Sequence, residues 1–315
     1  MQELKVMILV VIHQSEEVLV NMQKVVFFNK EIEIREHYCQ LNSLPSSKIE
    51  EPYVNIYISI TNVCNASCAF CCSKKVNKVI TNFDFEKFKE IILEINKKVR
   101  INKCSFTGGE PTLEFQTLIK CLEFVKSIDK NIFTVINTNG INLNKLSPYL
   151  HLINSIALSR HHYNDETNFK IFNNFNLPIT EDISEFPDKS KLHLSCNLIK
   201  EYVGNPQEVV NYLEWVSTIG CYDVGFVSLM QVNNYCKNNF VDFKSLSFED
   251  INNVFITKNW NFGNLCRCRN YNYISQNAEI IDVYSRYYVS PTYNGSALVF
   301  DGEYLRLGFD GEIVY

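Results

Sequence analysis

The sequence predicts an α/β fold, a partial (β/α)6 barrel, and two observations support this prediction. First, β-branched and aromatic segments alternate with segments whose apolar residues recur at helical spacing, as in parallel βα units. Second, polar and cysteine-bearing motifs follow the ends of the strand segments, where β/α barrels carry their chemistry. The expected strands are residues 53–61, 101–107, 132–138, 153–159, 191–199 and 222–229.

Two of the connecting helices have recognisable start signals. Asp84 can cap a helix because its carboxylate can accept a hydrogen bond from the first turn. Asn205 and Pro206 open a later helix, since proline is favoured at the first helical position. The apolar residues expected to face the core in the first helix are Phe88, Ile91, Ile92, Ile95 and Val99.

The barrel is expected to occupy residues 51–235 and to carry an extension at each end. Residues 1–50 hold short apolar runs and predict a small β-rich appendage, which ends at a break over Leu44–Ser47. Residues 236–315 are also β-rich and are expected to cover the barrel mouth. Their hairpin signals are Asn294-Gly295, Asp301-Gly302 and Asp310-Gly311.

Composition excludes several protein classes. The chain has 315 residues, of which 46% are hydrophobic and 21% charged, with a net charge of −5, as in a core-forming soluble chain. No basic run stands out, which argues against a dedicated nucleic-acid binder. No apolar run approaches the ~20 residues that span a bilayer, and Val6–Ile12 is interpreted as a strand rather than a signal peptide. The 12 cysteines are expected to be free thiols in a reducing cytoplasm.

The most informative stretch is Asn62–Lys74, in which Cys64, Cys68 and Cys71 form a C-x3-C-x2-C pattern. Thiolates at these offsets can converge on a small metal centre and are the ligands that iron–sulfur clusters take. Structural zinc is the competing interpretation, but zinc usually needs four protein ligands. The adjacent Cys72 is expected to point elsewhere, so one metal position would stay open.

This pattern, with Phe70 just before the third cysteine and at the exit of a strand, resembles the cluster loop of the radical S-adenosylmethionine (SAM) enzymes. A second motif of that family follows the next strand, Gly108-Gly109-Glu110-Pro111. The resemblance runs from about Tyr53 to about Met230 and implies a partial TIM-like barrel. It also implies a [4Fe–4S] cluster on the three cysteines, with SAM chelating the fourth iron.

The resemblance assigns further residues to SAM. The Gly108–Pro111 motif is expected to hold the methionyl amino end, with Glu110 as a carboxylate for an ammonium group. Asn139 is a candidate for the ribose, with an ordinary Asn-Gly turn as the alternative. Ser159 and Arg160 end the fourth strand, and a guanidinium can bind a carboxylate bidentately. The remaining cofactor candidates are Phe70 and Asn197, although a core asparagine would be the alternative role for the latter.

Catalytic residues are less well defined by the sequence. His161 and His162 are candidates for proton transfer or substrate recognition, and Cys196 for hydrogen donation to a substrate radical. The neighbouring Asp165 could instead cap a helix. A second metal site involving Cys266 and Cys268 is a further hypothesis, with Cys236 as a third ligand, and free thiols are the alternative.

The resemblance implies a mechanism. A flavodoxin- or ferredoxin-like donor reduces the cluster, SAM is cleaved reductively, and the 5′-deoxyadenosyl radical abstracts hydrogen from a substrate. The tail is distantly similar to the end of the molybdenum-cofactor precursor cyclases, which favours a small-molecule or nucleotide-like substrate. A ribosomally synthesised peptide is the alternative substrate. A zinc-stabilised binding protein without catalysis is the alternative of another class.

Overall fold

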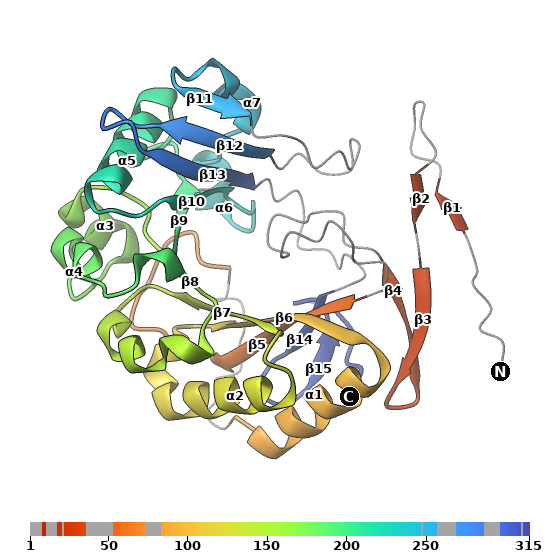
Figure 1. Ribbon diagram of the computed structural model, residues 1–315. Helices are drawn as coiled ribbons and strands as arrows, with labels where there is room; N and C mark the ends of the chain where they lie inside the picture. The colour runs from red at the N-terminus through yellow and green to blue at the C-terminus, as the bar shows by residue number, and fades with distance from the viewer. Residues whose placement is uncertain are drawn as a thin grey trace.

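The computed structural model describes residues 8–10, 18–20, 22–35, 53–72, 83–246, 248–256, 269–286, 297–309 and 311–315. Its main feature is an 11-stranded sheet with the order β11-β12-β13-β10-β9-β8-β7-β6-β5-β14-β15. Figure 1 shows this sheet with helices α1 to α5 along one of its faces. The protein is therefore of mixed α/β class with a large, mostly parallel sheet.

Six consecutive strands form the centre of the sheet, and each pairs in parallel with the next. They match the six strands expected from the sequence, with ends that differ by at most two residues. They are β5 (Tyr53–Thr61), β6 (Arg100–Gly108), β7 (Phe133–Thr138), β8 (Ser155–Ser159), β9 (Leu192–Leu198) and β10 (Asp223–Ser228).

Helices connect these strands and cover one face of the sheet. Asp84 caps α1 as expected, since its carboxylate accepts a hydrogen bond from the Lys87 N–H at 2.9 Å, and Asn205 caps α5 in the same way. The α-helices are α1 (Phe85–Lys98), α2 (Phe115–Ile128), α3 (Asp165–Phe172), α4 (Thr180–Ser184), α5 (Pro206–Thr218), α6 (Asn234–Asn238) and α7 (Phe243–Leu246). The 3-10 helices are η2 (Pro111–Glu114), η3 (Leu143–Leu152), η4 (Lys189–Lys191) and η5 (Phe248–Asp250).

Strands from the C-terminal part of the chain extend the sheet at both edges. β13 (Ile280–Arg286) pairs in parallel with β10, and β12 (Arg269–Ile274) and β11 (Val254–Ile256) follow it antiparallel. At the other edge β14 (Ala297–Phe300) pairs in parallel with β5, and β15 (Leu305–Leu307) completes a hairpin through Asp301-Gly302. The Asp301-Gly302 turn was expected, whereas Asn294-Gly295 and Asp310 lie outside the described residues.

The N-terminal part contains two small antiparallel pairs. β1 (Ile8–Val10) pairs with β2 (Val18–Val20), and β3 (Met22–Phe27) pairs with β4 (Lys30–Arg35). Val25, Phe27, Ile32 and Ile34 are buried in the same core cluster as the central strands. The second hairpin therefore packs on the main sheet.

Strand side chains alternate between two environments, and this alternation decides which residues line each face. In β9, Leu194 and Cys196 are buried while His193, Ser195 and Asn197 are partly exposed. The buried face is the helix-facing one, because Phe226 of β10 packs against Tyr212 of α5 with ring centroids 5.5 Å apart. The opposite face, which we call the concave face, carries the polar strand side chains.

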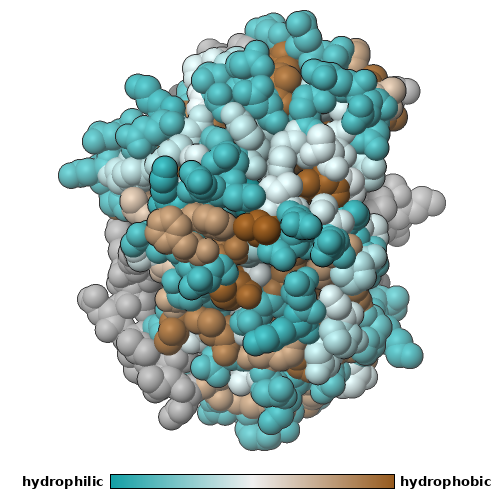
Figure 2. All heavy atoms as spheres, turned by 90° about the vertical axis from the view of Figure 1, so that its left-hand side faces the viewer, coloured by the Kyte–Doolittle hydropathy of each residue, from teal (hydrophilic) through white to brown (hydrophobic). Residues whose placement is uncertain are grey.

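The outer surface over α3, α4 and α5 mixes hydrophilic residues with hydrophobic patches (Figure 2). Phe175, which is 69% exposed, and Ile179 lie in the α3–α4 connection. Among the residues that the structure describes, no helix combines the length and apolarity needed to cross a membrane.

Candidate active site

The cysteine loop, which we define as Asn62–Cys72, leaves the carboxyl end of β5. Its three motif thiols differ in exposure, since Cys64 is exposed, Cys71 is partly buried and Cys68 is buried. Cys68 packs against Phe172 and Leu177 from the α3 region. The packing of Cys68 therefore anchors one side of the loop, whereas the side with Cys64 is exposed to solvent.

Backbone groups of the cysteine loop are hydrogen-bonded to three other segments of the chain. These segments are the glycine loop (Gly108–Pro111), the end of α3 and the start of α6. The contacts are Glu110 N–H to the Val63 carbonyl (2.9 Å), Ser67 N–H to the Phe172 carbonyl (2.9 Å), Asn174 Nδ2 to the Asn65 carbonyl (3.2 Å), and Asn233 Nδ2 to the Ala69 carbonyl (3.0 Å). The structure thus fixes the loop by residues far apart in the sequence.

The glycine loop packs directly on the cysteine loop, which explains its two glycines. Gly108 has a φ of +123°, and a Cβ there would lie 2.1 Å from the Thr61 carbonyl oxygen. A Cβ on Gly109 would lie 2.2 Å from the Val63 carbonyl oxygen. The sequence predicted that this motif holds the amino end of SAM; the structure adds a close approach of its backbone to the end of β5 and to the cysteine loop.

Glu110 is 1% exposed and sits at the centre of a hydrogen-bond cluster. Its carboxylate accepts bonds from the hydroxyl groups of Thr112 (2.6 Å) and Thr138 (2.7 Å) and from the Asn139 N–H (2.7 Å). Burial raises the pKa of this carboxyl, while the hydrogen bonds oppose the rise. Glu110 therefore ties the end of β7 to the glycine loop, and its contact with a SAM ammonium group stays a prediction.

Asn139 lies between the glycine loop and the first thiol. Its Nδ2 donates to Asn65 Oδ1 at 2.8 Å and lies 4.0 Å from Cys64 Sγ. Its Oδ1 accepts the Ile141 N–H at 3.1 Å. The side chain is thus positioned beside the predicted cluster ligand, whereas the ribose contact stays a prediction.

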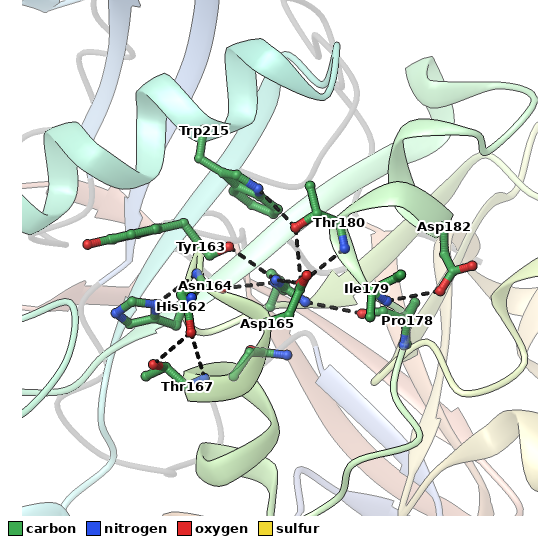
Figure 3. Close-up of polar contacts among 12 residues, drawn as sticks. His162, Tyr163, Asn164, Asp165, Thr167, Pro178, Ile179, Thr180, Asp182 and Trp215 are labelled. Atoms are coloured by element: carbon green, nitrogen blue, oxygen red, sulfur yellow. Dashed lines mark hydrogen bonds and ion pairs between the residues drawn. The ribbon is translucent and has the colours of Figure 1, made fainter.

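Arg160, at the end of β8, is buried, and its guanidinium group binds other groups of the protein. It forms an ion pair with Asp165 and donates to the carbonyl groups of His162 (2.8 Å), Tyr163 (3.2 Å) and Pro178 (3.1 Å). Asp165 also accepts from Thr180, which in turn accepts the Trp215 indole N–H (Figure 3). These contacts favour a role in holding the β8–α4 connection, and binding of the SAM carboxylate by Arg160 stays a prediction.

The structure corrects the alternative role considered for Asp165. The cap of α3 is Asn164, whose Oδ1 accepts the Thr167 N–H at 3.0 Å. Asp165 instead pairs with Arg160. The sequence placed the cap one residue late because both side chains have the cap preference.

His161 and His162 are both buried, in different surroundings. The His161 ring stacks on Phe172 and meets Phe70 of the cysteine loop edge-on, and its Nδ1 accepts the Asn197 N–H at 3.1 Å. Burial, aided by the Arg160 charge, lowers the pKa of His161 to about 3. Burial also lowers the pKa of His162, whose Nδ1 accepts the Asn164 N–H. Of the two, His161 is the one in contact with the cysteine loop.

The remaining candidates lie at the same end of the sheet. Ser159 and Asn197 belong to the partly exposed, concave-face sets of β8 and β9. Cys196 is fully buried on the helix-facing side of β9, and burial raises its pKa well above the usual value. Cys196 therefore faces away from Asn197, and its hydrogen-donor role stays a prediction.

The cysteine loop supplies three thiols, the ligand type that iron–sulfur clusters take. Among the described residues, no three histidine, cysteine or carboxylate side chains, the motif thiols included, are grouped closely enough to hold a metal ion. A cluster binds three thiolates, each on a separate iron, and the loop offers three thiols and a buried amide group without a partner in the described part of the chain, Asn65 Nδ2, on the residue after the first cysteine. Cys266 and Cys268 lie outside the described residues. Cys236 is described, and its Sγ lies 3.7 Å from the Phe70 carbonyl oxygen.

Three asparagines that hold the cysteine loop were absent from the residues selected on sequence. They are Asn65, Asn174 and Asn233. Asn65 directly follows the first motif cysteine, which was the available signal. The other two lie in connections whose proximity depends on the tertiary fold.

Parts of the chain are similar to a known family and to several known proteins. Residues 58–180 match the Radical SAM superfamily. Protein YydG of Bacillus subtilis, which carries a peptide-biosynthesis name, is 32% identical over 102 residues, which are 32% of each chain. A SAM-dependent nucleotide dehydratase of Fibrobacter is 32% identical over 121 residues, 36% of this chain and 35% of that one.

Two further similarities cover more of the chain at lower identity. A GTP 3′,8-cyclase of Staphylococcus aureus is 25% identical over 222 residues, 64% of this chain and 61% of that one. The SAM-bound structure of Streptococcus suis SuiB overlaps 58% of this chain and 42% of that one, at a TM-score of 0.47 and 16% identity. The chain thus matches about a third of the length of the first two relatives and 61% of the cyclase.

Proposed function

Because residues 58–180 match the Radical SAM superfamily, we propose that the chain is a radical SAM enzyme that acts on a small-molecule or nucleotide-like substrate. The observation that carries the proposal is the direct packing of the glycine loop on the end of β5 and on the cysteine loop, because the Gly109 N–H donates to the Thr61 carbonyl and the Glu110 N–H to the Val63 carbonyl. Two motifs that lie about 40 residues apart in the sequence meet at the carboxyl ends of adjacent strands. A zinc-stabilised binding protein offers no reason for this arrangement.

We infer that the six central strands form a partial (β/α)6 barrel spanning residues 51–235. Their order in the sheet follows their order in the chain, as a barrel requires. The division into a 1–50 appendage, the barrel and a 236–315 extension over the barrel mouth belongs to the same proposal. The participation of β13 and β14 in the sheet makes the extension part of its framework.

Cys64, Cys68 and Cys71 would hold a [4Fe–4S] cluster, and the glycine loop, Asn139, Ser159 and Asn197 would contact SAM. When bound and reduced, such a cluster would supply the electron for reductive cleavage of SAM, and SAM would supply the radical that takes a hydrogen atom from the substrate. The chain orients these groups through its fixed loop backbone. Because burial lowers its pKa to about 3, His161 is neutral at physiological pH. Its ring contacts Phe70 of the cysteine loop and Phe172 of α3, and this aromatic packing excludes water from the buried side of the loop.

The concave face carries a row of polar side chains at the amino ends of β9 and β10, away from the carboxyl ends where the cysteine and glycine loops lie. His193 Nδ1 lies 2.7 Å from Asp223 Oδ1, and Asp223 pairs in register with Asp282, which accepts a bond from Asn272. This row crosses four strands on the side away from the helices. The support for a nucleotide-like substrate is that two of the relatives carry names that specify nucleotide substrates.

A ribosomally synthesised peptide is the second candidate substrate. The observation in its favour is the 32% identity to a protein with a peptide-biosynthesis name. An electron donor of the flavodoxin or ferredoxin type belongs to both proposals.

The test is anaerobic reconstitution with iron and sulfide, followed by reduction with dithionite in the presence of SAM. We expect about four irons per chain and formation of 5′-deoxyadenosine, and neither in a Cys64→Ala/Cys68→Ala/Cys71→Ala variant. Cys72→Ala is the matched control, because Cys72 is an exposed neighbour outside the motif. One bound zinc with intact SAM would refute the proposal.

The substrate class is tested on the same material. Nucleoside triphosphates and candidate precursor peptides are added separately, and 5′-deoxyadenosine formation is compared with the substrate-free rate. Acceleration by a nucleotide, with a matching change in its mass, supports the first candidate. Acceleration by peptides alone supports the second.

A further inference from the structure

The first motif cysteine has an amide cluster beside it, formed by Asn65 and Asn139. Asn139 is 7% exposed, and its Nδ2 lies 2.8 Å from Asn65 Oδ1 and 4.0 Å from Cys64 Sγ. The Ala66 N–H also donates to Cys64 Sγ at 3.4 Å. Two N–H donors, from the Ala66 backbone and the Asn139 side chain, therefore lie next to one sulfur atom.

The direction of both amides follows from their hydrogen bonds. The Ile141 N–H must find an acceptor, so the atom of Asn139 that it contacts is the oxygen. The nitrogen of Asn139 consequently faces Asn65, which must present its own oxygen in return. This leaves Asn65 Nδ2 buried, with no acceptor among the described residues.

A buried donor without an acceptor costs free energy, and nearly all such groups in folded proteins have a partner. The acceptor that fits this position is a sulfur anion, because a thiolate or cluster sulfide carries negative charge and accepts N–H donors. The Asn139 backbone is itself fixed by Glu110, whose carboxylate accepts its N–H at 2.7 Å. The amides are therefore held in place before any cluster binds.

We propose that Asn65 and Asn139 donate hydrogen bonds to the Cys64 end of the cluster and raise its reduction potential. This inference rests on the proposed function, since it needs the cluster. Hydrogen bonds to cluster sulfurs stabilise the extra negative charge of the reduced form. The pair acts as positioning and tuning residues, and Glu110 connects them to the glycine loop.

The test is a redox titration of the reconstituted full chain, monitored by electron paramagnetic resonance. Asn65→Leu and Asn139→Leu remove the donors at similar side-chain volume. Each is expected to weaken reduction of the cluster at least tenfold, a shift of about 59 mV to more negative potential for a one-electron couple. Asn142→Leu is the matched control, because the Asn142 amide donates to the Thr112 carbonyl at 3.0 Å; its potential should equal that of the native chain.

A second measurement covers variants that fail to bind iron. Pulsed electron paramagnetic resonance of the native chain, labelled with ¹⁵N-asparagine and reduced, should detect side-chain amide nitrogens coupled to the cluster. Variants that bind the cluster and keep the native reduction potential would overturn this inference but not the proposed function. The absence of ¹⁵N coupling in the native chain would have the same meaning. A native chain that binds no cluster would overturn the proposed function as well.

Discussion

His161 should make the stability of the folded chain depend on pH, and the size of the effect follows from its burial. Burial lowers its pKa from 6.5 to about 3 in the folded state, whereas the unfolded chain keeps the ordinary value. Between these two values the unfolded state binds one more proton than the folded state. The stabilisation is therefore complete above pH 6.5 and is lost as the pH falls from 6.5 toward 3.

One pKa unit corresponds to about 1.36 kcal/mol. Between pH 6.5 and pH 5, His161 should therefore reduce the free energy of unfolding by about 2 kcal/mol. His162 acts in the same direction, because burial lowers its pKa too. Comparison of the native chain with a His161 variant separates the contribution of His161 to the pH-dependent loss of stability from that of His162.

The variant is His161→Gln, whose side chain can still accept the Asn197 N–H. Urea unfolding, monitored by fluorescence under reducing anaerobic conditions, is measured for the metal-free native chain and the variant at both pH values. The native chain should lose about 2 kcal/mol more than the variant. His151→Gln is the control, because His151 is exposed and the variant should follow the native chain. Equal losses in the native chain and His161→Gln would refute the reasoning.

Three other perturbations test the framework of the site. Gly225→Ala places a Cβ 2.6 Å from His193 Nε2 and should lower the free energy of unfolding by about 1–3 kcal/mol; an unchanged urea midpoint would contradict this packing. Asp165→Ala leaves the Arg160 guanidinium, 2% exposed, without its carboxylate. The variant should lower the free energy of unfolding by about 3 kcal/mol in the same assay; an unchanged value would show that the ion pair does not stabilise the fold. Asn174→Ala removes one anchor of the cysteine loop and should reduce iron bound per chain, measured colorimetrically; full occupancy would show the anchor to be dispensable.

Much of the sheet was predictable because its strands are buried on one face and bounded by turn residues. The prediction of β5 as residues 53–61 was correct at both ends. The start of α1 at Asp84 was also correct, since a local hydrogen bond decides it. These features depend on neighbours in the sequence, which a single chain reveals.

The features that were missed depend on contacts between distant segments. No local signal indicated that β13 and β14 would join the sheet at opposite edges. The protein partners of Arg160 also depend on tertiary packing, since it pairs with Asp165 and lies 5.1 Å from the Trp215 ring of α5; its contact with SAM stays a prediction. The motif cysteines were selected on spacing alone, and their assignment as cluster ligands stays a prediction.

The pairing of β14 with β5 has a consequence for how the chain is made. Ala297 pairs with Asn55, so β14 cannot cover the outer edge of β5 until residues 297–300 have been synthesised. An open strand edge can pair with another molecule, and the strand in question is the one that leads into the cysteine loop. Truncation before residue 297 should therefore produce aggregation during synthesis, detectable as a shift of the protein into the insoluble fraction.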